Sequence, residues 1–518
     1  MNIFIVLFLY FVENCDSYKI LTIFPYNGRS HHIYYSSFVE ELAKRQHDVT
    51  VINYHPVQKL PMLRQISLQD TESTSDRVDI EEHLKVLSSN DFSVAYDTAH
   101  AFAYIANTNC KKLVKNREVQ DLIKSTTHFD VVIVEQFVTD CGLAVAYKFN
   151  APTVGMTAHI LMPWTYSRLG APNNPAYVPN HFFASATKPD LLTKIKSAII
   201  NFGMNMYFKY VIQSYDQEIV NEVYPGMPLL EGLGKNMSLI MLNQYFPLTS
   251  PHICSSNVIE IGGMHIKQNI QIENKDLQNF LDTTTNKVVY ISFGSVASNF
   301  PRRITDEVIK FIEKSSMSFV WKSDVTDWVP PSNVFVGNWM PQTAILCESS
   351  KSSCIYCMLS HSGMLSTSEA IHCGVPIIGL PLFGDQFANG QSAVESGLGV
   401  TVDVLTLNEY MLKDALKAIL QPKYQKKAKE LSRLWKDRPL SPMDTAIFWV
   451  EYVARNKGAV SLKPLTVDLP LYQYLLIDII VVLGLMVILT LFIMLQIVLW
   501  AISGKKETLV KKAKKKIK

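Results

Sequence analysis

Residues 354–381 read CIYCMLSHSGMLSTSEAIHCGVPIIGLP, and this stretch decides the fold class. An apolar run ends at Ser360, a polar turn follows, and a helical stretch ends at Gly374 before a second apolar run begins. Short apolar runs of this kind are typical of buried strands, and a helix between two of them connects parallel strands. The stretch therefore predicts a strand–helix–strand unit of a parallel sheet.

Further apolar runs lie on the N-terminal side of this unit, with helical stretches between them. They are residues 18–24, 48–53, 129–134, 238–243, 287–294, 318–323 and 334–339. This alternation predicts doubly wound parallel sheets of the α/β class. An irregular stretch with a Gly-Gly pair at residues 255–269 divides the runs into two sets. We therefore expect two α/β domains, at residues 18–262 and 263–460.

The composition is that of a globular chain without a nucleic-acid surface. The chain has 518 residues, of which 48% are hydrophobic, enough for two cores. Its net charge of +3 is produced by the last 14 residues, which hold eight lysines and one glutamate. The rest of the chain is mildly acidic, so a nucleic-acid partner is not expected.

Both ends of the chain carry targeting signals. Residues 1–17 combine an apolar run with a small-residue cleavage pattern, as in a secretory signal peptide. Residues 479–502 are uncharged and long enough to span a membrane, and a basic tail at 503–518 follows. The tail ends in KKIK, which resembles a retrieval signal for the endoplasmic reticulum. We expect a single-pass type I protein of that membrane, with its α/β domains in the lumen.

Polar side chains follow the ends of four predicted strands in the second domain. They are Ser295; Trp339 and Gln342; His361, Gly363, Ser366 and Glu369; and Asp385 with Gln386. Ligands of open α/β sheets bind beyond the carboxyl ends of the strands. Serines and a glycine at a helix start suit a phosphate, an indole can stack on a base, and a carboxylate can hold hydroxyls. Base, ribose, diphosphate and a polyol would thus meet at one sheet edge.

Each of these residues also has a simpler reading. A serine can cap a helix, a histidine or tryptophan can belong to the core, and Asp385 can cap the helix that follows it. Cys354 and Cys357 have CxxC spacing in an apolar run, which favours a buried pair or a local disulfide over a metal site. Eight cysteines are too sparse for a disulfide framework. No metal site is expected, and the sequence contains no DxD triplet.

The run from Trp339 to Asn389 resembles the signature of the UDP-glycosyltransferases. NVIEIGGMHI and RLGAPNNPAYVPN resemble the insect members of that family, and the resemblance covers nearly the whole chain. It implies a GT-B fold of two facing Rossmann-like domains with no cofactor beyond the UDP-sugar co-substrate. By motif, Trp339 would stack on uracil, and Gln342 and Glu369 would bind the base and ribose. The diphosphate would be surrounded by Ser295, His361, Gly363 and Ser366, which leaves Asp385 and Gln386 for the sugar.

The resemblance also implies a catalytic base in the first domain. Its Ser-His pattern after the first strand falls on Ser30 and His31, so His31 would take the proton of the acceptor hydroxyl. A carboxylate should orient this imidazole. Glu135 at a strand end and Asp140 at the next helix start compete for this role, and we favour Asp140.

The expected reaction is inverting transfer of a hexose, glucose rather than glucuronic acid, to a small lipophilic acceptor, as in detoxification. The alternative is an inactive binder of UDP-sugars or lipophiles on the same fold. A Rossmann oxidoreductase would need GxGxxG after the first strand, where this chain has NGRSHH. The chain departs from the family pattern at Ser362, where glycine is usual, and in a longer stretch at 343–360. Association into homo-oligomers is left open.

Overall fold

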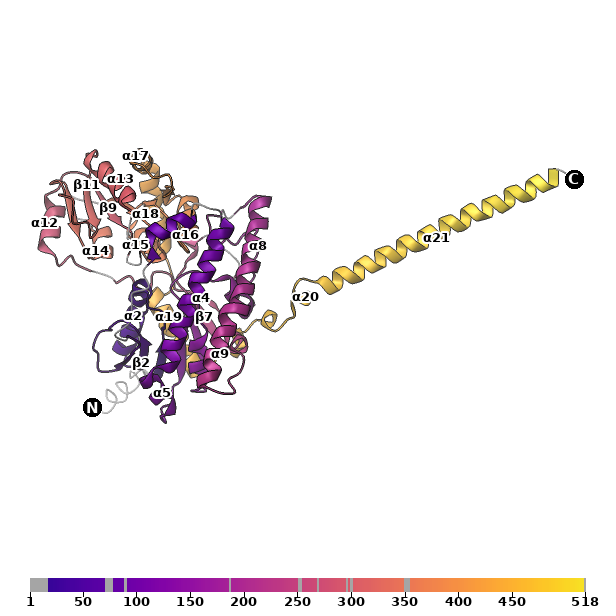
Figure 1. Cartoon of the computed structure of the whole chain (residues 1–518), viewed down its shortest axis with the longest axis horizontal. Helices are drawn as coiled ribbons and strands as arrows, with labels where there is room; N and C mark the ends of the chain where they lie inside the picture. The colour runs from indigo at the N-terminus through magenta and orange to yellow at the C-terminus, as the bar shows by residue number, and fades with distance from the viewer. Residues whose placement is uncertain are drawn as a thin grey trace, which may run out of the picture. The chain divides into compact units, whose positions relative to one another are not determined.

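The computed structural model describes residues 17–69, 78–87, 91–185, 188–249, 254–267, 270–294, 297–298, 301–348 and 355–516 (Figure 1). The chain divides into two compact units, Met1–Pro464 and Leu465–Lys518. The predicted signal peptide up to residue 16, Ser295, Cys354 and the last two residues of the KKIK motif lie outside the described residues.

The first unit contains two large parallel sheets, and the N-terminal one has seven strands in the order β3-β2-β1-β5-β6-β7-β8. The strands are β1 (Lys19–Ile23), β2 (Asp48–Asn53), β3 (Leu63–Ser67), β5 (Val131–Glu135), β6 (Thr153–Thr157), β7 (Leu239–Leu242) and β8 (Val258–Glu260). Every pair of neighbours is parallel. The register places Ile23 beside Ile52 and Val134, so the ends of β1, β2 and β5 lie at one edge.

The second sheet has six parallel strands in the order β12-β11-β9-β13-β14-β15. They are β9 (Val288–Ser292), β11 (Ser318–Lys322), β12 (Val334–Gly337), β13 (Ile355–Ser360), β14 (Ile377–Gly379) and β15 (Gly399–Thr401). This is the doubly wound order, in which ligands bind where the strand order reverses. Ser292 is in register with both Lys322 and Ser360, so β9, β11 and β13 end together.

Helices connect the strands of each sheet. In the N-terminal part they are α2 (Arg29–Lys44), α3 (Ile80–Leu87), α4 (Asp91–Lys115), α5 (Arg117–Lys124), α6 (Cys141–Tyr147), α7 (Pro163–Tyr166), η1 (Ser167–Leu169), α8 (Leu191–Tyr207), η2 (Phe208–Ile212), α9 (Gln213–Val223), α10 (Leu230–Lys235) and α11 (Phe246–Thr249). In the C-terminal part they are α12 (Lys275–Thr283), α13 (Arg302–Glu313), α14 (Gln342–Leu346), α15 (Met364–Cys373), α16 (Gln386–Ser396), α17 (Glu409–Ile419) and α18 (Pro422–Lys436). Two short strands, β4 (Val78–Asp79) and β10 (Ala297–Ser298), pair with each other.

The sequence explains the βαβ unit around α15. The polar turn after β13 starts the helix at Met364, and Gly374 ends it in the left-handed conformation at φ 69°. Glycine adopts this conformation without steric cost, as the predicted helix end requires. Helix α2 forms because Tyr34, Tyr35 and Phe38 recur at helical spacing and are buried against the first sheet.

The C-terminal end of the first unit returns to the first sheet. Helix α19 (Pro442–Arg455) buries Ile447, Val450 and Val453 in the core around β1 and β5. Asp444 pairs with Arg45 at the end of α2. Residues of α19, which the sequence assigned to the second domain, therefore pack in the core of the first sheet.

Two disulfides were not expected from the sequence. Cys110 in α4 bonds Cys141 at the start of α6, and Cys347 after α14 bonds Cys373 at the end of α15. Cys357 is a buried free thiol in β13, so of the two expectations for the CxxC spacing the local disulfide is wrong, while the buried pair is untested because Cys354 lies outside the described residues.

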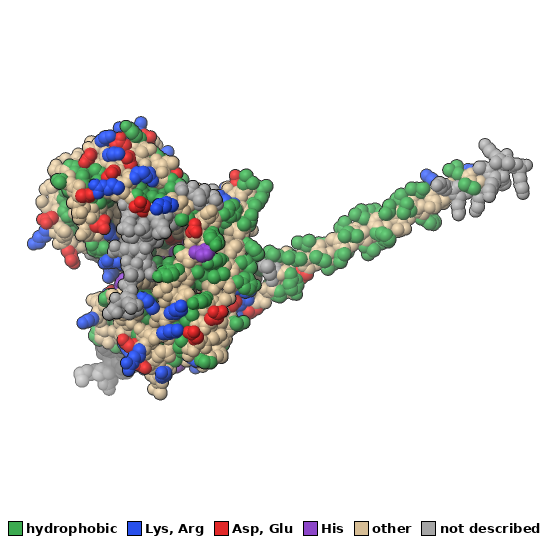
Figure 2. Space-filling view, in the orientation of Figure 1, with side chains coloured by type: hydrophobic (Ala, Val, Ile, Leu, Met, Phe, Trp, Pro, Cys, Tyr) green, Lys and Arg blue, Asp and Glu red, His purple; other side chains and the backbone are tan. Residues whose placement is uncertain are grey.

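The second unit consists of η4 (Leu465–Val467), α20 (Leu471–Tyr474) and α21 (Ile477–Lys516), while η3 (Val460–Leu462) ends the first unit. Residues Ile477–Val510 of α21 are long and apolar enough to cross a membrane. Hydrophobic side chains cover the helix from residue 477 to residue 502, as Figure 2 shows. The span includes the predicted segment 479–502.

Candidate functional site

A cavity of about 440 Å³ lies in the first unit, where the carboxyl ends of strands from both sheets supply its walls. Residues that line it from the N-terminal part, on α2, α4 and the loops around the first sheet, include Tyr26, Ser30, His31, Phe102, Phe137, His159, Met162 and His181. Those from the C-terminal part include Gly294, Lys322, Trp339, Gln342, His361, Gly363, Ser366, Glu369, Asp385 and Gln386. All the predicted site residues that the structure describes line this cavity, apart from Glu135 and Asp140.

His31 lies in the first turn of α2, directly after β1. Its Nδ1 is 2.6 Å from Oε1 of Glu135, the last residue of the neighbouring strand β5. A carboxylate accepts, so Nδ1 carries the proton and Nε2 keeps a free lone pair. Glu135 is buried, and its other oxygen accepts from the backbone N–H of Tyr26 at 3.3 Å. The pair is therefore arranged so that His31 can accept a proton in the cavity.

Asp140 does not contact His31, so our preference for it as the partner is wrong. Both of its carboxylate oxygens accept from Arg168, at 2.9 and 2.6 Å, and Oδ2 also accepts from Gln213 at 2.8 Å. Asp140 and Arg168 are both buried. Position in the sequence would have indicated the correct carboxylate. Glu135 is the last residue of a strand beside β1, whereas Asp140 lies beyond the turn that follows this strand.

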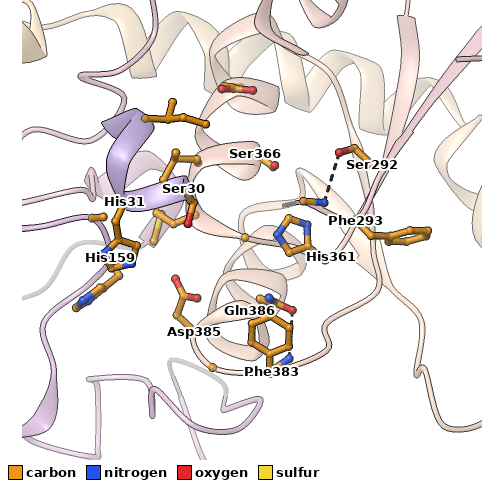
Figure 3. Close-up of a pocket in the computed structure, with 18 of the residues that line it drawn as sticks. Ser30, His31, His159, Ser292, Phe293, His361, Ser366, Phe383, Asp385 and Gln386 are labelled. Atoms are coloured by element: carbon orange, nitrogen blue, oxygen red, sulfur yellow. Dashed lines mark hydrogen bonds between the residues drawn. The ribbon is translucent and has the colours of Figure 1, made fainter. Parts of the chain in front are cut away.

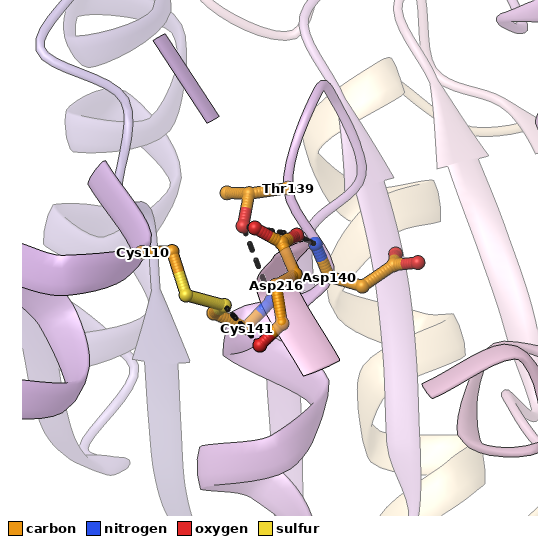
Figure 4. Close-up of a disulfide and its surroundings, with 5 residues drawn as sticks. All are labelled: Cys110, Thr139, Asp140, Cys141 and Asp216. Atoms are coloured by element: carbon orange, nitrogen blue, oxygen red, sulfur yellow. Dashed lines mark hydrogen bonds between the residues drawn. A yellow bond between two sulfur atoms is a disulfide. The ribbon is translucent and has the colours of Figure 1, made fainter. Parts of the chain in front are cut away.

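The surroundings of Asp140 are structural (Figure 4). Asp216 accepts from Oγ1 of Thr139 at 2.8 Å and from the backbone N–H of Asp140 at 2.9 Å, next to the Cys110–Cys141 disulfide. Burial raises the pKa of Asp216 well above its usual value. The two cysteines and Asp216 are close enough to suggest metal ligands, but the disulfide occupies both sulfur atoms.

His361 forms the centre of the second wall (Figure 3). A Cβ added to Gly294 or Gly363 would lie 2.7 or 2.4 Å from its Nε2, so both glycines allow the ring to lie against the backbone. Burial and the charge of Lys322 lower the pKa of His361 to about 4, which keeps the ring neutral. The ring lies beside the N-terminus of α15, where free N–H groups favour an anion.

The side chain of Ser362 does not enter the cavity. Ser362 is buried, has a φ of 63°, and its Oγ would lie 2.4 Å from a Cβ on Gly379 in β14. The departure from the family's glycine therefore changes the packing between β14 and α16 and leaves the anion site open.

Gln342, Ser366 and Glu369 form one hydrogen-bonded group. Nε2 of Gln342 donates to Glu369 at 2.6 Å and to Oγ of Ser366 at 3.0 Å. The other oxygen of Glu369 is 3.3 Å from Nε2 of His265. The Cys347–Cys373 disulfide joins the ends of α14 and α15, which carry this group. The residues predicted for base and ribose are thus held together before any ligand binds.

Two cations that the sequence analysis missed lie against Trp339. The indole is 54% exposed, with the guanidinium of Arg29 4.3 Å and the ammonium of Lys322 4.5 Å from its ring centre. Lys322 also donates to the carbonyl of Gly294 at 3.1 Å. Burial and repulsion from Arg29 lower the pKa of Lys322 to about 8. Among the described residues neither cation forms an ion pair, so both can neutralise a bound anion.

Asp385 and Gln386 begin α16 at the end of the loop after β14. Asp385 makes no side-chain bond to the helix backbone; it accepts from Asn389 at 2.9 Å, and burial raises its pKa. Figure 3 shows its carboxylate in the space between His31 and Gln386. The side-chain oxygen Oε1 of Gln386 accepts from the backbone N–H groups of Leu382 and Phe383, at 2.8 and 3.1 Å.

Residues 19–516 match the family described as "UDP-glucoronosyl and UDP-glucosyl transferase". The chain is 31% identical over 509 residues to "UDP-glycosyltransferase UGT5" of Dactylopius coccus, covering 96% of this chain and 94% of that one. It is 31% identical over 487 residues to "UDP-glucosyltransferase 2" of the same insect, covering 92% and 91%. It is 28% identical over 475 residues to human "UDP-glucuronosyltransferase 1A10", covering 89% and 87%.

A solved structure of similar fold is a UDP-glucosyltransferase from Polygonum tinctorium. It superimposes with a TM-score of 0.56 at 15% identity, covering 85% of this chain and 99% of that one. The two parallel-sheet domains are those of the GT-B fold, as predicted.

Proposed function

Because the chain belongs to the family of UDP-glucuronosyl and UDP-glucosyl transferases, we propose that it transfers glucose from UDP-glucose to a hydroxyl of a small lipophilic acceptor. The observation that carries this proposal is the His31–Glu135 pair, which faces Asp385 across the cavity. A free imidazole lone pair near a group that can hold sugar hydroxyls is what direct transfer requires.

In the proposed reaction, Nε2 of His31 takes the proton of the acceptor hydroxyl as its oxygen attacks the anomeric carbon. The bond from that carbon to the UDP oxygen breaks on the opposite face, so configuration inverts and UDP leaves. Glu135 stabilises the imidazolium that forms. Asp385 and Gln386 would hold the sugar hydroxyls, with Asp385 able to accept from two of them.

The nucleotide would be held by the second wall. Trp339 would stack on uracil once Arg29 and Lys322 move to the diphosphate, and the group around Glu369 would bind the ribose. Lys322, neutral His361 and the N-terminus of α15 supply donors and positive charge for the leaving group. We therefore propose that transfer needs no metal ion, and that activity survives EDTA.

Apolar walls support a lipophilic acceptor, because Phe102, Phe137 and Met162 line the first half of the cavity. We further propose that α21 anchors the chain in the endoplasmic reticulum membrane with its α/β domains luminal, in keeping with a role in detoxification. The lysines after the apolar stretch support a cytosolic tail.

Transfer assays with the full chain in microsomes test this function. Radiolabelled UDP-glucose and UDP-glucuronate are offered with a panel of phenols, with and without EDTA, and UDP binding is measured in parallel. Labelled product from UDP-glucose in both conditions is the expected result. UDP binding without product from either donor would make the chain an inactive binder, and product from UDP-glucuronate alone would change the donor.

A further inference from the structure

His159 is a second imidazole in the acceptor half of the cavity, and the proposed reaction does not use it. It follows β6, the strand next to β5, and is 4% exposed. Its ring centre is 5.8 Å from that of His31 and 5.0 Å from that of Phe137. Figure 3 shows His31 and His159 side by side.

The hydrogen bond of His159 determines which of its nitrogens carries the proton. Nδ1 is 2.6 Å from the backbone carbonyl of Ile160. A carbonyl oxygen can only accept, so Nδ1 carries the proton and Nε2 keeps a lone pair. Nε2 is buried and has no partner among the described residues. Burial and the nearby His31 and His181 hold the pKa of His159 well below its usual value, so the ring stays neutral.

A buried lone pair without a donor costs free energy, and a ligand that brings a hydroxyl to it removes that cost. Water could bring such a hydroxyl too, but His159 lines the wall that receives the acceptor, beside aromatic rings. His31 has the same tautomer because Glu135 accepts from its Nδ1. The wall therefore carries two imidazoles that can both only accept at Nε2.

We propose that His159 binds a second hydroxyl of the acceptor, so that the preferred acceptors are aromatic compounds with two hydroxyl groups. One hydroxyl loses its proton to His31 and receives the sugar. The other donates to Nε2 of His159 and stays unmodified. The ring centres are 5.8 Å apart, so one aromatic acceptor can offer a hydroxyl to each imidazole. This inference rests on the proposed function, whose acceptor class it narrows.

The test is the ratio of kcat/KM for a dihydroxy acceptor to kcat/KM for a matched acceptor with one hydroxyl. Resorcinol is compared with 3-methylphenol, and hydroquinone with 4-methylphenol, because each pair exchanges a hydroxyl for a methyl group of similar size. We expect kcat/KM about tenfold higher for the dihydroxy member of at least one pair in the wild-type chain. In His159→Phe the ratio should fall to about two, the statistical factor for two equivalent hydroxyls, and His159→Gln should restore part of it because its side-chain carbonyl can accept. A general loss of activity in a variant lowers kcat/KM for both acceptors equally and leaves this ratio unchanged.

His181→Phe is the matched control, since His181 is equally buried in the same wall, with its ring 5.8 Å from that of His159. A wild-type ratio no higher than about two, an unchanged ratio in His159→Phe, or a larger fall in His181→Phe would overturn the inference.

Calorimetric binding of the same acceptors in the presence of UDP separates this inference from the proposed function. If the chain prefers dihydroxy acceptors in a way that depends on His159 but shows no turnover, the proposed transferase activity is wrong and the dihydroxy binding site is supported. Turnover without such a binding preference would support the transferase activity and refute the role of His159.

Discussion

The two walls of the cavity differ in how the chain builds them. The donor wall comes largely from one stretch, residues 337–386, and its side chains are already bonded to one another. The acceptor wall gathers segments around His31, Phe102, Phe137, His159 and His181 from across the first domain. Groups that must hold the same nucleotide can thus be encoded locally and preorganised, whereas the acceptor pocket depends on tertiary packing.

The largest expected effect separates chemistry from donor binding. Replacing the base in His31→Ala should lower turnover about 100-fold or more, because burial holds the pKa of the neighbouring His159 well below its usual value and makes that imidazole a poor substitute base. UDP affinity should stay nearly unchanged, since the donor wall is intact. Turnover numbers and calorimetric UDP titration measure both. His32→Ala is the control, and an equal loss there would assign the base to the wrong histidine.

Replacing Glu135 should mainly lower turnover, whereas replacing Asp140 should mainly lower stability. Glu135→Gln should lower turnover at least about tenfold with little change in melting temperature, because it weakens the support of the imidazolium. Asp140→Asn removes the negative charge that pairs with the buried guanidinium of Arg168. This change should cost about 3 kcal/mol of folding free energy. Kinetics and thermal unfolding of both variants measure this. A larger kinetic defect in Asp140→Asn at unchanged stability would return the role to Asp140.

The two disulfides offer a matched comparison between the walls. Replacing both cysteines of either pair by serine should cost about 3 kcal/mol of stability, since the linked residues are 31 and 26 positions apart. Only loss of Cys347–Cys373 should also weaken UDP binding, because it joins the helices that carry Gln342 and Glu369. Equal UDP affinity in the two double variants would show that the donor wall needs no such link.

Lys322 should give the smallest of these effects. Lys322→Met should weaken UDP binding about tenfold, with Lys322→Arg retaining most of the affinity. The charged form binds the diphosphate and its pKa is about 8, so wild-type affinity should fall as pH rises through 8. Titrations between pH 7 and 9 measure this. The same pH dependence in Lys322→Met would assign it to another group.

The sequence predicts the donor wall well because its residues follow strands and turns whose spacing is local. All nine predicted strands form, and Gly374 ends α15 as expected. Lys322 was missed because a charged residue at the end of β11 looks like an ordinary solvated side chain. Only the register with Ser292 brings it to the anion site.

The acceptor wall was harder to predict because its contacts join distant segments. Glu135 and Asp140 are both carboxylates, and the pairing of Asp140 with the buried Arg168, 28 residues further along the chain, is seen only in the structure. No sequence pattern indicates His159. Its role follows from the hydrogen bond of Nδ1 to the carbonyl of Ile160 and from an Nε2 without a donor among the described residues. The return of α19 to the first sheet likewise depends on packing that no local pattern specifies.

The configuration of the product tests the central claim most directly. The sugar of UDP-glucose is α-linked, and proton NMR of the purified glycoside reads the configuration of its anomeric carbon. Single displacement assisted by His31 predicts a β-glucoside. An α-glucoside would contradict the account, because retention requires a different arrangement of groups around the anomeric carbon than a base opposite the leaving UDP.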